Sequence, residues 1–124
     1  MSLVETSMMQ RLSQFLDTTA RRSGIIAGNI ANLDTPGYHT RDVDFRSQLS
    51  ALMGGGAQMQ EPRVIEVQGL TERPDGNNVN MDREGLALAQ TQLQFQTGVA
   101  LLKAEMHRLS QAIHEGGTQS TSSA

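Results

Sequence analysis

The sequence predicts a mainly helical protein. Two long helices, one near each end of the chain, are expected to form a coiled-coil-like pair, and the small irregular middle segment can hold a short β-hairpin. Three observations predict this fold class. Apolar residues recur at alternating steps of three and four near both ends, all three prolines lie between those repeats, and only four of the 124 residues are aromatic. Because large aromatic side chains fill much of a compact core, their scarcity argues against a thick globular body. We expect a single domain over residues 1–124.

The first repeat predicts an N-terminal helix over residues 7–33. Side chains at this spacing form one stripe along a helix, and a period near 3.5 residues favours wrapping around a partner helix. Glycine costs about 1 kcal/mol relative to alanine inside a helix. Gly24 and Gly28 therefore mark either a close approach of another backbone or a helix that is merely weak there. The members of the repeat are Met9, Leu12, Leu16, Thr19, Ser23, Ile26, Ile30 and Leu33.

A turn is expected to end this helix at residues 34–37. Pro36 disfavours the helical conformation for Thr35, and a Pro-Gly pair suits the two central positions of a type II turn. Residues 34–79 therefore leave the helix and form this turn, an extended segment and a variable middle.

The middle of the chain is expected to contain short elements. Residues 38–45 are expected to be extended, and residues 44–53 can form a short amphipathic helix. Residues 64–67 are β-branched and apolar enough for a strand that is half of a hairpin. The three glycines at 54–56 break the short helix, and residues 73–78 form a turn-rich loop.

The second repeat predicts a C-terminal helix over residues 80–115. Asn80 or Asp82 can cap its start, the glycine pair at 116–117 is expected to end it, and residues 116–124 are expected to form a flexible tail. At a rise of 1.5 Å per residue the two helices span roughly 40 and 50 Å, which predicts an elongated molecule. The members of this repeat are Leu88, Gln92, Phe95, Val99, Leu102, Met106, Leu109 and Ile113.

The two apolar stripes predict a helix-packing or subunit interface. Pairing the helices with each other hides only part of each stripe, so the remaining faces need neighbouring chains or the middle segment. The alternative is an ordinary intramolecular hairpin. Under either interpretation, polar members of the repeats can set the register of packing at a cost in stability. The apolar residues of the predicted interface are Met9, Leu12, Leu16, Ile26, Ile30, Leu33, Leu88, Phe95, Val99, Leu102, Met106, Leu109 and Ile113.

Charge and composition exclude several classes of partner. Thirteen acidic and ten basic residues give a formal net charge of −3, and the chain lacks the clustered lysines and arginines that bind nucleic acid. No stretch approaches the roughly 18 apolar residues of a membrane span, so we expect no direct membrane insertion. The N-terminus has no cleavable secretory signal, although specialised secretion routes need none.

No group of residues predicts catalysis. His107 and His114 share a helix face two turns apart, too far for one metal ion, and His39 lies far along the chain. Asp42 and Asp44 could resemble a carboxylate pair, but local turn bonds or ion pairs with the neighbouring Arg41 and Arg46 are expected instead. We therefore expect no enzyme activity, no metal site, no cofactor and no small-molecule substrate.

A polar motif follows the first repeat. Asn29 and Asn32 lie three residues apart although asparagine disfavours helix interiors, and C-terminal capping alone would explain them. The run from Asn29 to Tyr38 resembles the Asn-x-x-Asn-x-x-Thr-Pro-Gly-Tyr signature of the flagellar rod and hook family of axial proteins, and residues 41–45 and 75–84 extend the resemblance. The residues of the motif and of the second loop are Asn29, Asn32, Asp34, Thr35, Pro36, Gly37, Tyr38, Asp75, Gly76, Asn77 and Asn78.

The resemblance implies a structural subunit at the proximal end of the basal-body rod, the periplasm-crossing shaft that transmits torque. It implies export by the flagellar type III apparatus without signal cleavage. It also implies as partners further copies of the chain, other rod subunits, a FliE-type adaptor, and the export gate and membrane ring at the rod base. Two alternatives remain, namely another small rod protein of the same family and a cytoplasmic coiled-coil adaptor or export chaperone.

Overall fold

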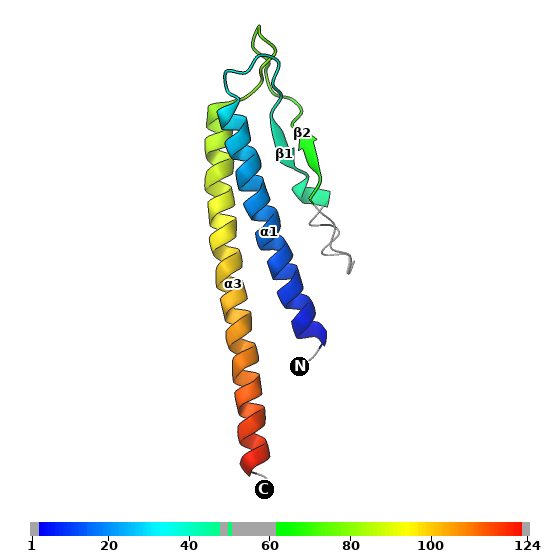
Figure 1. The fold of residues 1–124 in the computed structure, drawn as a ribbon, viewed down its shortest axis with the longest axis vertical. Helices are drawn as coiled ribbons and strands as arrows, with labels where there is room; N and C mark the ends of the chain where they lie inside the picture. The colour runs from blue at the N-terminus through cyan, green and yellow to red at the C-terminus, as the bar shows by residue number, and fades with distance from the viewer. Residues whose placement is uncertain (1–2, 48–49, 51–61, 123–124) are drawn as a thin grey trace.

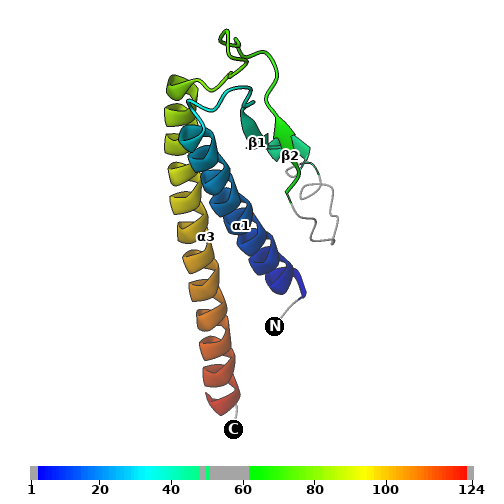
Figure 2. The same ribbon diagram turned by 45° about the horizontal axis from the view of Figure 1, so that its top comes forward.

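The computed structural model describes residues 3–47, 50 and 62–122. Helix α1 (Leu3–Ala31) and helix α3 (Met81–Ser122) lie side by side and antiparallel, and strands β1 (Arg41–Val43) and β2 (Val64–Glu66) run alongside α1 (Figure 1). In both views α1 lies between α3 and the strands (Figure 2). The structure confirms the predicted fold class: a mainly helical chain with two paired terminal helices and a small two-stranded antiparallel sheet.

The helices differ in length. α1 has 29 residues and α3 has 42, and the C-terminal end of α3 projects past the N-terminus of α1 (Figure 1). The connections gather at the opposite end of the pair. This arrangement gives the molecule a joined end and an open end.

The chain leaves α1 through a tight turn. Tyr38 N donates to Thr35 O at 3.2 Å, and Gly37 has a φ of +74°. A hydrogen bond from the fourth residue to the first, with a positive φ at the third, is typical of a type II turn, which the Pro-Gly pair favours.

The sheet joins the extended segment after this turn to the middle of the chain. Its register places Asp42 opposite Ile65, and β1 runs antiparallel to β2. Val67 N donates to Thr40 O and Asp44 N to Arg63 O, so the pairing continues beyond both ends of the strands. Residues 45–47 and 50 of the expected short helix are helical. Its other positions, except 44, and the glycines at 54–56 lie outside the described residues.

The start of α3 follows the expected capping, whereas its end differs from the prediction. Asn80 Oδ1 accepts a hydrogen bond from Arg83 N at 3.2 Å, the geometry of an N-cap. The helix does not end at the glycine pair 116–117 but continues to Ser122, so residues 116–122 are helical rather than a flexible tail. Glycine weakens a helix by about 1 kcal/mol per residue but ends it only when the chain turns into a left-handed cap.

The core is a thin layer between α1 and α3. Ile26, Ala87 and Leu109 are buried there. A Cβ built on Gly98 would lie 2.7 Å from Leu16 Cδ2 and 3.0 Å from Phe15 Cδ2. The helices therefore approach closely at Gly98, a position that the sequence patterns do not single out.

Candidate functional site

The joined end of the molecule, which we call the junction, is built around Asn29. Its Nδ2 donates to Arg41 O at 2.7 Å and to Glu84 Oε2 at 3.1 Å, and its Oδ1 accepts from Tyr38 Oη at 3.0 Å and Arg41 N at 3.1 Å. The side chain is fully buried. An amide side chain has two donors and two acceptor lone pairs, so Asn29 uses its whole hydrogen-bonding capacity. One residue thereby ties α1, the chain entering β1 and the first turn of α3 together.

Asn77 connects the two loops of the junction. Its Nδ2 donates to Asn32 O and to Thr35 O, both at 2.9 Å, and its Oδ1 accepts from Val79 N at 2.8 Å. Asn32 holds its own turn, because its Nδ2 donates to Gly28 O at 2.7 Å. The motif asparagines therefore add side-chain hydrogen bonds to carbonyl groups at the end of α1 and in the following turn, each of which also accepts a backbone amide.

Two further hydrogen bonds hold the two loops of the junction in close contact. Thr40 N donates to Asn78 Oδ1 at 2.6 Å, and Gly37 N donates to Asp75 O at 2.9 Å. Gly76 has a φ of +85°, and a Cβ on it would lie 3.3 Å from Gly37 Cα. Both glycines allow left-handed turns, and Gly76 also leaves room for the other turn. The structure therefore brings the two motif segments into contact.

A compact charged cluster completes the junction. Arg22 binds Asp42 with Nε to Oδ1 at 3.0 Å and Nη2 to Oδ2 at 3.3 Å, and Arg83 Nη2 binds Asp42 Oδ2 at 2.8 Å. Arg83 Nη1 also reaches Glu84 Oε1 at 2.8 Å. Two positive and two negative side chains balance, so the cluster carries no formal net charge.

The environment of Asp42 favours its ionised form. Burial alone would raise the pKa of Asp42, but hydrogen bonds from Arg22, Arg83 and the Val43 amide outweigh burial and lower that pKa below its ordinary value. The expected local ion pairs of Asp42 are not the ones formed, because its partners come from α1 and α3. Sequence reasoning missed Arg22 and Arg83 as site residues, since nothing in their local spacing links them to Asp42.

The predicted interface residues are covered to different degrees within the single chain. Ile26 and Leu109 are buried, whereas Phe95, Met106 and Ile113 are 43%, 52% and 63% exposed. The other predicted interface residues are partly exposed, namely Met9, Leu12, Leu16, Ile30, Leu33, Leu88, Val99 and Leu102. Pairing within one chain thus leaves much of the α3 stripe in water.

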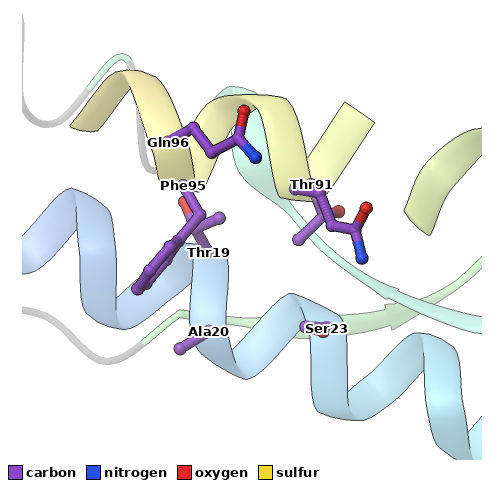
Figure 3. Close-up of a pocket in the computed structure, with 7 residues that line it drawn as sticks. Thr19, Ala20, Ser23, Thr91, Phe95 and Gln96 are labelled. Carbon is purple, nitrogen blue, oxygen red and sulfur yellow. The ribbon is translucent and has the colours of Figure 1, made fainter. Parts of the chain in front are cut away.

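Two grooves follow the helix pair. One, of about 500 Å³, is lined by residues from both helices, and Figure 3 shows Thr19 and Ser23 of α1 beside Thr91 and Phe95 of α3. Its walls are mostly small or polar side chains. The other, of about 390 Å³, lies toward the open end and is more apolar. Its lining residues are Met9, Met106, Leu109, Ser110 and Ile113.

Among the described residues, no group of three or more metal-binding side chains comes together. His39 Nε2 contacts Glu72 Oε1 at 2.8 Å and His39 Nδ1 contacts Glu66 Oε2 at 3.4 Å, all on exposed side chains. In the part of the chain that the structure describes, neither long helix is apolar enough over a sufficient length to span a bilayer. The main features of the described residues are therefore the exposed apolar faces of the helices and the polar junction.

Comparison with known proteins gives the class and then the family. No protein-family model matches the chain. Its relatives include flagellar basal body rod proteins from Escherichia coli K12, 34% identical over 82% of this chain and 88% of the relative, and from Salmonella typhimurium, 32% identical over the same shares. A rod protein of Cereibacter sphaeroides is 32% identical over 82% of this chain and 89% of its own length. The chain is therefore a structural, non-enzymatic flagellar rod protein. It belongs to the FlgB family.

Proposed function

We propose that this chain polymerises through α1 and α3 at the proximal end of the rod, the drive shaft that crosses the periplasm and transmits torque. The observation that carries the proposal is the uncovered stripe on α3, where Phe95, Met106 and Ile113 are about half exposed or more. Burying a large apolar side chain contributes about 1.5–3 kcal/mol. Covering these three side chains with neighbouring helices would therefore favour assembly.

The junction supports the same proposal. Because Asn29 and Asn77 hold the loops and both helices in one arrangement, the two stripes meet a neighbour as one preformed surface. A preformed surface loses less conformational entropy on binding than a mobile one. A shaft under torque also needs subunits that do not shear internally, and the partly buried ion pairs of Asp42 resist such movement.

We further propose export by the flagellar type III apparatus without cleavage. The proposed neighbours are copies of this chain, other rod subunits, a FliE-type adaptor, and the export gate and membrane ring. Membership of the FlgB family supports this location. The family does not require any particular contact face, so the faces need a direct test.

The test is incorporation into basal bodies. Untagged wild-type chain and an Ile113→Glu variant are expressed in the bacterium that encodes the chain, and basal bodies are isolated and analysed by mass spectrometry. We expect wild-type chain with an intact N-terminus in the basal bodies and much less of the variant, because a charge cannot be buried in an apolar contact. Thr71→Glu, in an exposed loop, is the control and should incorporate normally. Wild-type chain confined to the cytoplasm would instead support an adaptor or chaperone.

A further inference from the structure

α3 carries a second stripe, on its outer face away from α1, that the paired helices leave uncovered. Leu86 and Leu93 are 63% and 65% exposed, more than Phe95 and Met106 of the predicted interface. At 3.6 residues per turn the members of this stripe fall within an arc of about 60°. We call this stripe the leucine seam, and its members, all exposed, are Leu86, Leu93, Thr97, Ala100 and Ala104.

α1 carries a matching stripe of small side chains. A Cβ built on Gly24 would have none of the described atoms within 4 Å, so the described part of the chain gives no reason for a glycine there. Ala20 belongs to the stripe and also lines the 500 Å³ groove, so the stripe continues into that groove (Figure 3). We call it the small seam, and its members, all exposed, are Ser13, Ala20, Gly24, Ala27 and Ala31.

The two seams match in length and in height. Each spans roughly 27 Å along its helix, and because α1 and α3 are antiparallel the seams run in opposite directions along the molecule. The contacts Leu16–Gly98 and Asn29–Glu84 fix the level of α1 against α3, and they place the seams at nearly the same height in the molecule. A sideways displacement of one copy therefore brings its leucine seam to the small seam of the next.

We infer that the leucine seam of one copy packs against the small seam of a second copy, an inference that rests on the proposed function. Bulky side chains facing small ones allow helix axes to approach to about 8 Å. Because the two seams are different surfaces, the contact is heterologous. It uses one seam of each copy and leaves the other seam of each copy free for a further copy. Such contacts repeat around a ring or helix instead of stopping at a dimer. Gly24 is then explained by a neighbouring subunit.

The first arm of the test is disulfide trapping, which is clean because the chain has no cysteine. The double variant Ala20→Cys with Leu93→Cys is expressed in the bacterium, and its isolated basal bodies are oxidised mildly. We expect disulfide-linked dimers and higher multimers from the double variant and none from either single variant. Dimers from a single variant would show like seams meeting and would overturn the inference. Incorporation of the double variant without cross-links would overturn it too and would leave the proposed function standing.

The second arm needs no cross-link. Gly24→Leu fills the small seam, and Gly28→Leu is the matched control, because a Cβ at Gly28 is equally free of described neighbours but lies outside the seam. We expect purified Gly24→Leu to unfold at the wild-type denaturant concentration or higher, since leucine favours a helix more than glycine does. Its incorporation into basal bodies should fall by about tenfold, a loss of 1.4 kcal/mol, while Gly28→Leu incorporates normally. Equal incorporation of both variants would overturn the inference, whereas absence of wild-type chain from basal bodies would overturn the proposed function itself.

Discussion

At the junction, Asn29 makes four hydrogen bonds and Asp42 accepts from two arginines and a backbone amide, all within one chain. At the open end, Met106 and Ile113 line an apolar groove and are more than half exposed. The junction satisfies its polar groups internally, whereas the open end leaves apolar surface for other contacts. This difference indicates that polar contacts within the subunit set the orientation of the helices, whereas burial of their apolar stripes requires neighbouring chains. The predictions below test that division.

The largest effect is expected at the charged cluster. Asp42→Ala leaves Arg22 and Arg83 without their carboxylate in a partly buried site, and breaking such a pair costs about 3 kcal/mol or more. Asp44→Ala is the control, because among the described residues that carboxylate bonds the nearby Ser47, and its loss should cost much less than the loss of Asp42. Urea unfolding of the purified chains measures both. If both variants lost the same free energy of unfolding, the junction would not dominate the stability of the chain.

The next effect concerns the closest approach of the helices. Gly98→Val places a branched side chain against Leu16 and Phe15, where a single Cβ already lies 3.0 Å or less from side-chain carbons. Overpacking of this kind costs about 1–3 kcal/mol. Gly24→Ala changes a helical glycine in open surroundings and should stabilise the purified chain by about 1 kcal/mol. Thermal unfolding followed by circular dichroism should show shifts of opposite sign, and shifts of the same sign would contradict the packing.

Acid should weaken the junction through Asp42. The folded-state pKa of Asp42 is lower than its ordinary value, so its stabilising effect is complete above the unfolded-state pKa of about 3.9 and is lost as pH falls through the folded-state pKa. Wild-type chain should therefore lose urea resistance more steeply than Asp42→Asn between about pH 5 and pH 3. The lowered pKa values of Asp44 and Glu105 are common to both chains and cancel in this comparison. Parallel curves would show that Asp42 does not couple folding to pH.

Sequence reasoning reached the fold because that part of the structure is encoded locally. The spacing of the repeats specifies helix faces, and the Pro-Gly pair specifies a turn. The partners of Asp42 were missed because Arg22 lies 20 residues away and Arg83 lies 41 residues away, so only the fold brings them together. Gly98 was missed for the same reason, since its need for space depends on which residue of α1 faces it.

The glycine pair at the end of α3 shows a different limit. Residues 116–117 carry the composition of a helix end, yet α3 includes both and continues to Ser122. A glycine ends a helix only where the chain gains by turning, for example through a left-handed cap that bonds the last carbonyls. A glycine permits the left-handed conformation of a helix cap, but the contacts around it determine whether the helix ends there.

The smallest effect is expected at the open end of the isolated chain. Leu109 is buried and Ile113, one turn further along the same groove, is 63% exposed. Leu109→Ala should cost about 2 kcal/mol in urea unfolding of the purified chain, whereas Ile113→Ala should cost about 0.5 kcal/mol or less, as exposed substitutions do. Incorporation into basal bodies should not follow this order of stability losses, because a neighbouring chain is then expected to cover Ile113. Ile113→Ala should reduce incorporation although it hardly alters the stability of the subunit. If Ile113→Ala destabilised the isolated chain as much as Leu109→Ala, the open end would already be closed within one subunit, and the division between the two ends would be wrong.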